Sequence, residues 1–267
     1  MFLMIKLAIS GGAGRMGGRL IDLGSQDKAF EIVAAIEAAD HPKIGSDAGI
    51  GSGTGELGVN YSDTYPDQVD AVIDFSLPTG ADKAIAYCSE HSRPLVMATT
   101  GLEPETIENL KQAATKIPIV WAPSMSLAVN LSMKLVEMAG VALKDHSTGV
   151  DVEIIERHHR FKADAPSGTA LKFGEIIADA MGQTVHQHGR EGITGERTRN
   201  EIGYHAVRTG DNPGQHTIVF GMLGETIELN VAASNRDCYA SGALAAAKFV
   251  VNQQPGLFNM YDVLGLN

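Results

Sequence analysis

The residues best suited to chemistry lie in one short segment, in which two adjacent histidines are followed by a lysine. The segment reads Glu156-Arg157-His158-His159-Arg160-Phe161-Lys162-Ala163-Asp164-Ala165-Pro166-Ser167-Gly168-Thr169-Ala170. Imidazole side chains exchange protons near neutral pH, and Lys162 adds a positive charge and a proton donor. Ser167-Gly168-Thr169 can begin a helix, whose free N–H groups favour a carboxylate. The segment therefore predicts acid–base groups beside an anion site.

Composition alone leaves other interpretations of this His/Lys segment open. It could be a solvated basic loop, and Asp164 could simply cap the helix expected to begin near Pro166. The two histidines could also bind a metal together with His186 and His188. No nearby carboxylate or thiol pattern completes such a site, so we expect no metal.

A second segment is rich in glycine and lies between an expected strand and an expected helix. It reads Gly11-Gly12-Ala13-Gly14-Arg15-Met16-Gly17. The spacing G-x-x-G-x-x-G allows a tight turn, close approach to a pyrophosphate, and close packing of the helix on the sheet. The first N–H groups of the helix would then face the phosphates. By itself, the pattern also fits a purely structural turn.

An acidic residue strengthens the dinucleotide interpretation. Glu37 lies 20 residues beyond Gly17, at the end of the second expected strand. A carboxylate there can accept hydrogen bonds from the adenosine ribose, although it could also be a solvated strand end. Its charge disfavours the 2′-phosphate of NADPH, and Ala38 after it offers no cation to compensate. Lys43 could reach over, although its loop is unconstrained. We therefore expect a preference for NADH, with NADPH tolerated.

Short apolar runs alternate with helical patterns through the first half of the chain. The expected strands are residues 5–10, 30–36, 69–75, 95–99 and 117–122, and the expected helices are 16–23, 79–90 and 103–115. This alternation predicts an α/β fold, with a Rossmann-like, doubly wound parallel sheet. Residues 45–58 hold six glycines and are predicted to form a flexible loop.

The pattern changes after residue 122. A long helix over 127–143 precedes a strand over 150–156, and a further helix begins near Ser167. Three strands then follow in close succession, at 201–208, 217–220 and 226–232. Close succession favours a mixed sheet, and hence a second, α+β domain. The chain returns to a helical pattern over 237–251.

Charge and cysteine content narrow the class of protein. The formal net charge is −11 with a pI near 5.2, which disfavours nucleic acid as a partner. The apolar start is too short to span a membrane, so we expect a soluble cytoplasmic protein. Cys88 and Cys238 suggest a reducing compartment, and neither has a base nearby in the sequence that would make it a nucleophile.

Together these motifs resemble the dihydrodipicolinate reductase (4-hydroxy-tetrahydrodipicolinate reductase) family of bacterial lysine biosynthesis, over nearly the whole chain. Besides the glycine turn and the E-x-H-H-x-x-K-x-D-A-P-S-G-T-A order, the resemblance is carried by Asp74-Phe75-Ser76, Thr99-Thr100-Gly101, Arg190-Glu191-Gly192 and Thr194-Gly195-Glu196-Arg197. The family implies NAD(P)H-dependent reduction of 4-hydroxy-tetrahydrodipicolinate in the diaminopimelate pathway. Hydride would reach ring C4 of this small dicarboxylate heterocycle.

The resemblance also assigns roles to residues. His158 would be the acid–base histidine and Lys162 a proton donor. The residues that would bind the substrate are His159, Lys162, Ser167, Gly168 and Thr169. The residues that would bind the cofactor are Gly11, Gly12, Ala13, Gly14, Arg15, Met16, Gly17, Glu37, Phe75, Ala98, Thr99, Thr100, Gly101, Ala122, Pro123, Ser124 and Met125.

The family further implies a homotetramer and an inserted domain. The dinucleotide-binding domain would comprise residues 1–126 and 237–267, and residues 127–236 would bind substrate and form subunit contacts. Closure about hinges near Ser126 and Asn235 would exclude water. Three departures from the family pattern, Ala38, Ala98 and Pro123-Ser124, bear on cofactor preference and on the nicotinamide contacts.

Two other functions compete with this one. A related two-domain dehydrogenase acting on an amino acid or a sugar would share the first half but would not need the E-x-H-H-x-x-K order. An NAD-sensing binding protein would leave His158, His159 and Lys162 without a role.

Overall fold

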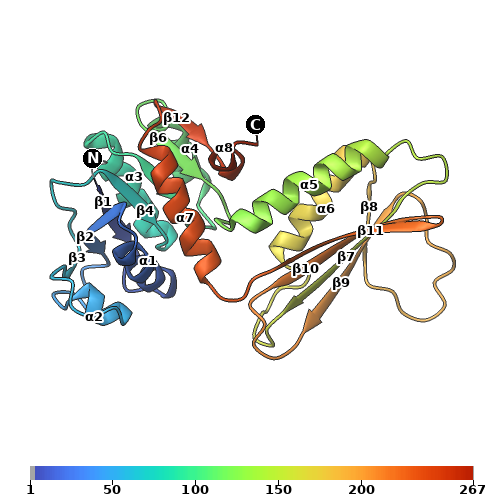
Figure 1. The fold of residues 1–267 in the computed structure, drawn as a ribbon, viewed down its shortest axis with the longest axis horizontal. Coiled ribbons are helices and arrows are strands. Elements are labelled where there is room, and N and C mark those ends of the chain that lie inside the picture. Colours follow the sequence, from blue (N-terminus) through green and yellow to red (C-terminus); the bar gives the residue numbers. More distant parts are fainter. Residues whose placement is uncertain (1–3, 267) are drawn as a thin grey trace. The chain divides into compact units, whose positions relative to one another are not determined.

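The chain divides into two units in a computed structural model that describes residues 4–266 (Figure 1). The first unit runs to Leu127 and resumes at Arg236, and the second is Ala128–Asn235. Residues 1–3 and 267 of the expected first domain lie outside the described residues.

The first unit is built on a seven-stranded sheet whose paired strands are all parallel. Its strands are β1 (Ile5–Ser10), β2 (Phe30–Ile36), β3 (Tyr61–Ser62), β4 (Ala71–Asp74), β5 (Leu95–Met97), β6 (Pro118–Trp121) and β12 (Gly256–Phe258). They lie in the order β12-β6-β5-β4-β1-β2-β3, so the direction of winding reverses between β1 and β4. The predicted Rossmann-like class is confirmed, and this reversal is where such folds bind ligands.

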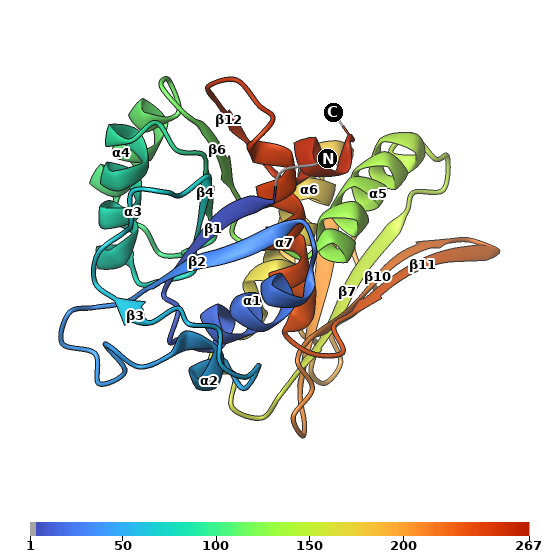
Figure 2. The same ribbon diagram turned by 60° about the vertical axis from the view of Figure 1, so that its left-hand side comes forward.

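Helices cover both faces of this sheet. The helices of the unit are α1 (Arg15–Gln26), α2 (Ala48–Ser52), α3 (Pro78–Glu90), α4 (Pro104–Ala113), α7 (Asp237–Val250) and α8 (Met260–Leu264). One apolar cluster joins the sheet to α1 and α7, and another joins it to α3 and α4 (Figure 2). The strands are apolar on both sides because both sides are buried.

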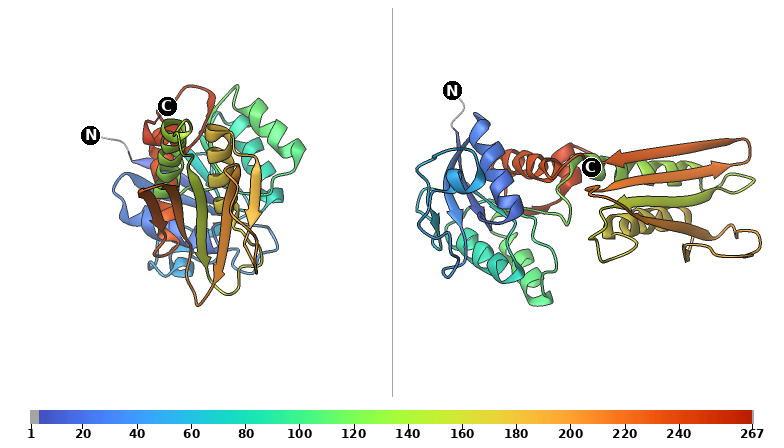
Figure 3. Two further views of the ribbon diagram at one scale, coloured as in Figure 1. Left: turned by 90° about the vertical axis from the view of Figure 1, so that its right-hand side faces the viewer. Right: turned by 90° about the horizontal axis from the view of Figure 1, so that it is seen from below.

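The second unit has a mixed five-stranded sheet, as predicted. Its strands are β7 (Asp151–His158), β8 (Val185–His188), β9 (Glu201–Arg208), β10 (Gln215–Met222) and β11 (Glu225–Ala232), in the order β11-β10-β7-β9-β8. β7, β8 and β9 are parallel, whereas β10 runs antiparallel to β7 and β11. Helices α5 (Leu127–Leu143) and α6 (Gly168–Met181) lie together on one face (Figure 3). Within residues 4–266, no helix is both long and apolar enough to cross a membrane.

The prediction of a flexible loop over residues 45–58 is wrong in part, because α2 forms there. Asp47 caps this helix by accepting a hydrogen bond from the Ile50 N–H at 2.9 Å. The same carboxylate accepts from Leu57 N–H at 3.2 Å and from Gly58 N–H at 2.7 Å. The single carboxylate of Asp47 thus orders a segment whose glycine content suggested a flexible loop. The short elements β3, β8, β12 and α8 were also not predicted, because each is too brief to show a period.

Close packing of α7 on the chain around Met125 makes a specific prediction. A Cβ atom on Gly242 would lie 1.7 Å from the Met125 carbonyl oxygen, so the backbones must move apart if the residue is enlarged. We expect Gly242→Ala to lower the free energy of unfolding by roughly 1–3 kcal/mol, measured by urea denaturation. Ser241→Ala, at the preceding exposed position, is the control and should change stability little. Equal stability of the two variants would contradict this packing.

Candidate functional site

The glycine turn joins β1 to α1 in the conformation that its sequence requires. Gly11 has φ +75°, and a Cβ atom there would lie 2.6 Å from the Phe75 carbonyl oxygen. A Cβ atom on Gly17 would lie 2.1 Å from the Gly11 carbonyl oxygen. Among the described residues, no side chain caps the N-terminus of α1, which begins after Gly14. The turn therefore brings bare backbone N–H groups to the end of β1, where an anion can bind.

Glu37 follows β2 and reaches back to this turn. Its Oε2 accepts a hydrogen bond from the Ala13 N–H at 3.1 Å, and its Oε1 accepts from its neighbour Ala38 at 3.1 Å. A carboxylate beside the glycine turn is the arrangement that recognises ribose hydroxyls in dinucleotide folds. The first unit thus fits a nicotinamide dinucleotide.

The other residues expected to bind cofactor also follow strands of this sheet. Phe75 comes directly after β4, Ala98–Gly101 after β5, and Ala122–Met125 after β6. Ala98 donates its N–H to the Asp74 carbonyl oxygen at 2.9 Å. In a parallel sheet the carboxyl ends of the strands meet at one edge, so the structure brings these segments to the edge that carries the glycine turn.

Asp74 is a residue whose role the sequence reasoning missed. It is fully buried and accepts hydrogen bonds from the hydroxyls of Thr99 and Ser76, the latter at 2.9 Å. Burial raises the pKa of Asp74 above its usual value. The carboxyl ties the end of β4 to the end of β5, so it sets the spacing of two expected cofactor segments. The sequence did contain a signal for this role, because Asp74 is a polar residue at the end of an otherwise apolar strand.

Lys43 is engaged within its own loop. Its Nζ lies 5.7 Å from the centre of the Tyr61 ring and 3.5 Å from the Gly51 carbonyl oxygen. Ala38 is exposed and offers no charge. Neither residue therefore offsets the carboxylate of Glu37.

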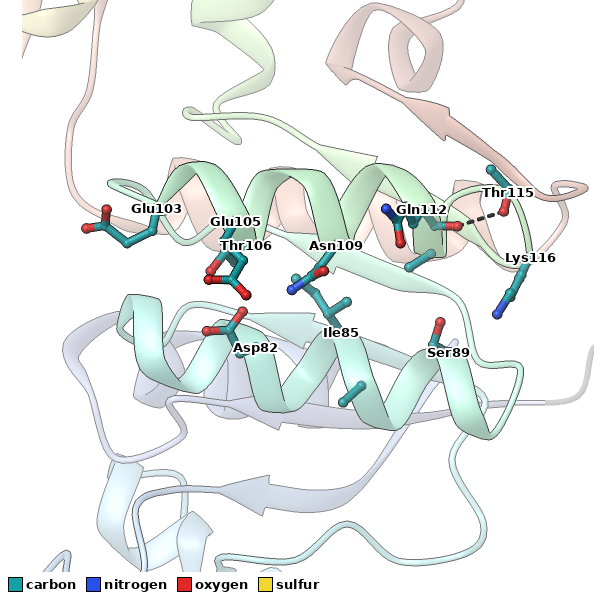
Figure 4. A pocket seen from close by; sticks show the side chains of 12 residues that line it. Asp82, Ile85, Ser89, Glu103, Glu105, Thr106, Asn109, Gln112, Thr115 and Lys116 are labelled. Atoms are coloured by element: carbon teal, nitrogen blue, oxygen red, sulfur yellow. Dashed lines mark hydrogen bonds between the residues drawn. The ribbon is translucent and has the colours of Figure 1, made fainter.

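A groove of about 760 Å³ lies elsewhere in the first unit, between α3 and α4. Figure 4 shows the carboxylates of Asp82 and Glu105 turned toward each other across it. Glu103 adds a further negative charge at the same end. None of the residues expected to bind substrate or cofactor is among those that line it. Its acidic end opposes an anionic ligand, so we do not place the site there.

In the second unit, the alternation of side chains along β7 separates buried from exposed residues at the start of the His/Lys segment. Side chains alternate along β7, and Glu156 and His158 are both buried whereas Ile155 and Arg157 between and beside them are exposed. The E-x-H spacing therefore places the carboxylate and the imidazole on one face. His158 keeps 9% of its surface exposed, which leaves it in limited contact with solvent.

The carboxylate of Glu156 is the centre of a hydrogen-bond network. It accepts from Arg208 at 2.7 Å on each oxygen, from His158 Nδ1 at 2.6 Å and from the Ser167 N–H at 3.0 Å. Burial alone would raise the pKa of Glu156, but the hydrogen bonds from Arg208, His158 and Ser167 outweigh it and lower the pKa. The residue is therefore a buried carboxylate with paired partners.

His216 completes the buried cluster, and sequence reasoning missed both it and Arg208. Its Nε2 lies 2.9 Å from Ser167 Oγ, and its ring centre is 5.2 Å from that of His158. Burial, followed by the repulsion from His158, lowers the pKa of His216 to about 4. The sequence did contain a signal for His216. It occupies every-second-residue register with Ile218 and Phe220 along β10, so it shares their buried face.

The remaining residues of the segment lie in the loop between β7 and α6. Ser167, not Asp164, caps α6, because its Oγ accepts from the Ala170 N–H at 3.1 Å. Asp164 instead pairs with Lys162 at 2.8 Å, so its proposed capping role is wrong. His159 Nδ1 is buried and has no hydrogen-bond partner within residues 4–266.

The interpretation of His186 as a metal ligand has no support in its contacts. His186 Nδ1 lies 2.7 Å from the Tyr204 hydroxyl, and His188 stacks on the same ring. Across the described part of the chain, no group of three or more His, Cys, Asp or Glu side chains is arranged to hold a metal ion.

Comparison with known proteins identifies the family. Residues 5–125 match the family described as dihydrodipicolinate reductase, N-terminus, and residues 128–264 match dihydrodipicolinate reductase, C-terminus. The chain belongs to the dihydrodipicolinate reductase family. A 4-hydroxy-tetrahydrodipicolinate reductase of Rhodopirellula baltica is 60% identical, with 98% of this chain and 97% of the relative covered. That of Geotalea uraniireducens is 42% identical, with coverage of 98% and 100%.

Solved structures agree with the family membership. A dipicolinate-bound dihydrodipicolinate reductase from Paenisporosarcina sp. TG-14 matches with a TM-score of 0.77 at 25% identity, over 97% of this chain and 99% of that one. An amine dehydrogenase from Mycobacterium smegmatis matches with a TM-score of 0.62 at 14% identity, over 96% and 95%, and shares the fold alone. The resemblance inferred from the motifs is thus confirmed.

The buried His216 ring makes stability depend on pH. In the unfolded chain the ring binds a proton below about pH 6.5, whereas in the folded protein it stays neutral until about pH 4. Proton uptake in this window favours the unfolded state, so stability is lost as pH falls through it. We expect a loss on the order of 3 kcal/mol in the free energy of unfolding.

Urea denaturation of the wild type and of His216→Gln over this pH range measures the effect. The variant should show a shallower fall, whereas the exposed-edge control His188→Gln should follow the wild type. Parallel curves for all three proteins would mean that His216 does not titrate differently on unfolding.

Proposed function

We propose that the chain reduces 4-hydroxy-tetrahydrodipicolinate to tetrahydrodipicolinate in diaminopimelate and lysine biosynthesis. The 4-hydroxyl leaves as water, and the ring is then reduced by NAD(P)H with one proton, which leaves NAD(P)+. The first unit would hold the cofactor and the second the substrate. The observation that carries the proposal is the buried Glu156–His158 pair of β7, whose carboxylate accepts from the Ser167 N–H just before α6, in a chain of this family. Acid–base groups beside a helix N-terminus suit a dicarboxylate ring.

The cofactor would be held by the glycine turn, by Glu37 and by the segments after β4, β5 and β6. When bound, the nicotinamide supplies a hydride to ring C4 of the substrate. Phosphates suit the N-terminus of α1, and Glu37 suits a ribose that carries free hydroxyls. We propose NADH as the preferred form, because the Glu37 carboxylate opposes a 2′-phosphate and Lys43 is engaged by Tyr61 and Gly51.

His158 and Lys162 would manage the negative charge that develops in the ring. A ring that accepts hydride becomes more basic, so a positioned acid must deliver a proton to it. His158 Nδ1 is held by the Glu156 carboxylate at 2.6 Å, which fixes the orientation of the ring. Lys162 is held near the start of the loop by its ion pair with Asp164 and is a second acid and a fixed charge.

The substrate carboxylates would bind at the start of α6. A Cβ atom on Gly168 would meet nothing within 4 Å, so the first turn of this 14-residue helix is open there. Thr169 adds a hydroxyl beside it. His159 Nδ1 lacks a partner among the described residues, and leaving such a buried atom unpaired costs roughly 1–3 kcal/mol. A ligand that paired with it would remove that cost.

We also propose a homotetramer in the cytoplasm. The uncovered face of the mixed sheet exposes the apolar side chains of Ile155 and Val207, which a second copy could bury. Neither Cys88 nor Cys238 is in a disulfide within the described residues, which suits a reducing compartment.

An assay with freshly generated substrate tests the reaction. The wild type should oxidise NADH, seen as loss of its absorbance, and either His158→Ala or Lys162→Ala should lower kcat by roughly 100- to 10,000-fold while the fold is kept. Lys172→Ala, an exposed lysine on α6, is the control and should retain activity. A wild type that leaves NADH unoxidised would reject the reaction, and a near-normal rate in either alanine variant would reject its role.

Cofactor preference is tested by comparing kcat/KM for NADH and NADPH. The wild type should favour NADH, and Ala38→Arg should raise kcat/KM for NADPH by about tenfold, because a cation would then face the 2′-phosphate. Glu31→Gln, at an exposed position on β2, should leave the ratio of kcat/KM for NADH to that for NADPH unchanged. A wild type with a strong preference for NADPH would contradict the role given to Glu37.

A further inference from the structure

The two buried polar residues of β7 face side chains from both neighbouring strands. In the sheet register, Glu156 lies opposite His216 of β10, and His158 lies opposite Arg208 of β9. The loop after β7 adds Ser167 and Lys162 to the same face, since Ser167 bonds to Glu156 and Lys162 acts electrostatically on His216. Each element packed against His158 thus contributes a polar group.

The donors around Glu156 fix which atom of His158 carries a proton. An ionised carboxylate accepts hydrogen bonds and donates none, so His158 Nδ1 must be the donor in the 2.6 Å contact. In the neutral ring, the lone pair is then on Nε2. Arg208 holds the carboxylate on both oxygens at 2.7 Å, which prevents Glu156 from turning away.

Space is left beside Nε2. A Cβ atom on Gly214 would lie 3.0 Å from His158 Nε2 and 3.3 Å from its Cδ2, so only glycine leaves this side of the ring uncrowded. Gly214 has φ +145°, a conformation that side chains rarely adopt. The backbone therefore keeps open the atom that the carboxylate leaves free.

The same carboxylate also fixes the start of α6. Its Oε1 accepts from the Ser167 N–H, one residue before the helix begins. Ser167 Oγ accepts from the Ala170 N–H and lies 2.9 Å from His216 Nε2. Burial and the repulsion from His158 lower the pKa of His216, so near neutral pH this ring places no second charge next to His158.

We propose that Glu156 is the positioning residue of this site: it holds His158 as the Nδ1–H tautomer with Nε2 as the proton-exchanging atom, and it joins that atom to the start of α6. Arg208 acts through Glu156 by fixing its orientation. The catalytic meaning of the arrangement rests on the proposed reductase reaction, whereas the tautomer itself does not.

The first test needs no substrate. Nitrogen-15 and proton NMR correlations of the imidazole rings, with His158 assigned from the spectrum of His158→Gln, should show the neutral ring of the wild type protonated on Nδ1. Glu156→Gln should give a mixture of tautomers, because the ring then faces an amide that can either accept or donate a hydrogen bond. A wild-type ring protonated on Nε2 would overturn the proposal.

Glu153→Gln is a matched control, because Glu153 lies on the opposite face of β7 and pairs with His205 at 2.7 Å and with Arg190. It should leave His158 as the Nδ1–H tautomer. An equal mixture of His158 tautomers in both variants would assign the effect to general charge and overturn the proposal.

The second test is kinetic. Glu156→Gln should lower kcat at least about tenfold, and the loss should follow the fraction of the Nδ1–H tautomer that NMR shows to be lost. Arg208→Lys keeps the charge but loses the two-pronged contact, so it should give a smaller loss with the same direction, and it replaces Glu156→Gln if that variant does not fold. A normal kcat in a folded variant with mixed tautomers would refute the positioning role. An inactive wild type with the Nδ1–H tautomer would refute only the reductase reaction.

Discussion

The second unit depends on one buried carboxylate. Glu156 is 1% exposed, and a buried carboxylate is costly unless its partners are complete. Those partners come from three elements: His158 from its own strand, Arg208 from β9, and the Ser167 N–H from the start of α6. Because the charge cannot remain buried without them, the same interaction that stabilises the ion also fixes His158 relative to the helix N-terminus.

The proposed cofactor site of the first unit is built in a different way. Its turn depends on the absence of side chains: a Cβ atom on Gly17 would overlap the Gly11 carbonyl oxygen, and one on Gly12 would lie 3.0 Å from the Ala35 Cβ atom. The proposed binding of a dinucleotide there would depend on backbone N–H groups and on the carboxyl ends of parallel strands. The second unit, by contrast, depends on side-chain charges that must be paired. A substitution is therefore felt as crowding in the first unit and as an unpaired charge in the second.

The sequence was sufficient where a pattern repeats locally. The ends of β1, β2 and β9 were predicted to the residue. β1 and β2 are short runs of mostly apolar residues, and the first is followed directly by Gly11. The sequence was insufficient where partners lie far apart in the chain. Arg208 is 52 residues from Glu156, and His216 is 49 from Ser167, so no local spacing reveals either contact. Residues 45–58 failed for a related reason, because a single carboxylate, Asp47, orders a segment whose composition indicates none.

Anion binding by this chain depends on local charges more than on its overall charge. A chain with a formal net charge of −11 repels a doubly charged anion at long range, but salt screens such repulsion beyond a Debye length of about 8 Å. What decides binding is therefore the charge within that distance. Around His158, the cations of Arg208 and Lys162 are each paired, with Glu156 and Asp164. Of the two pairs, only the one made by Asp164 is exposed, with 60% of that side chain open to solvent. A ligand carboxylate can displace an exposed partner far more cheaply than a buried one, so Lys162 is the cation that can change partners while Arg208 keeps the histidine in place.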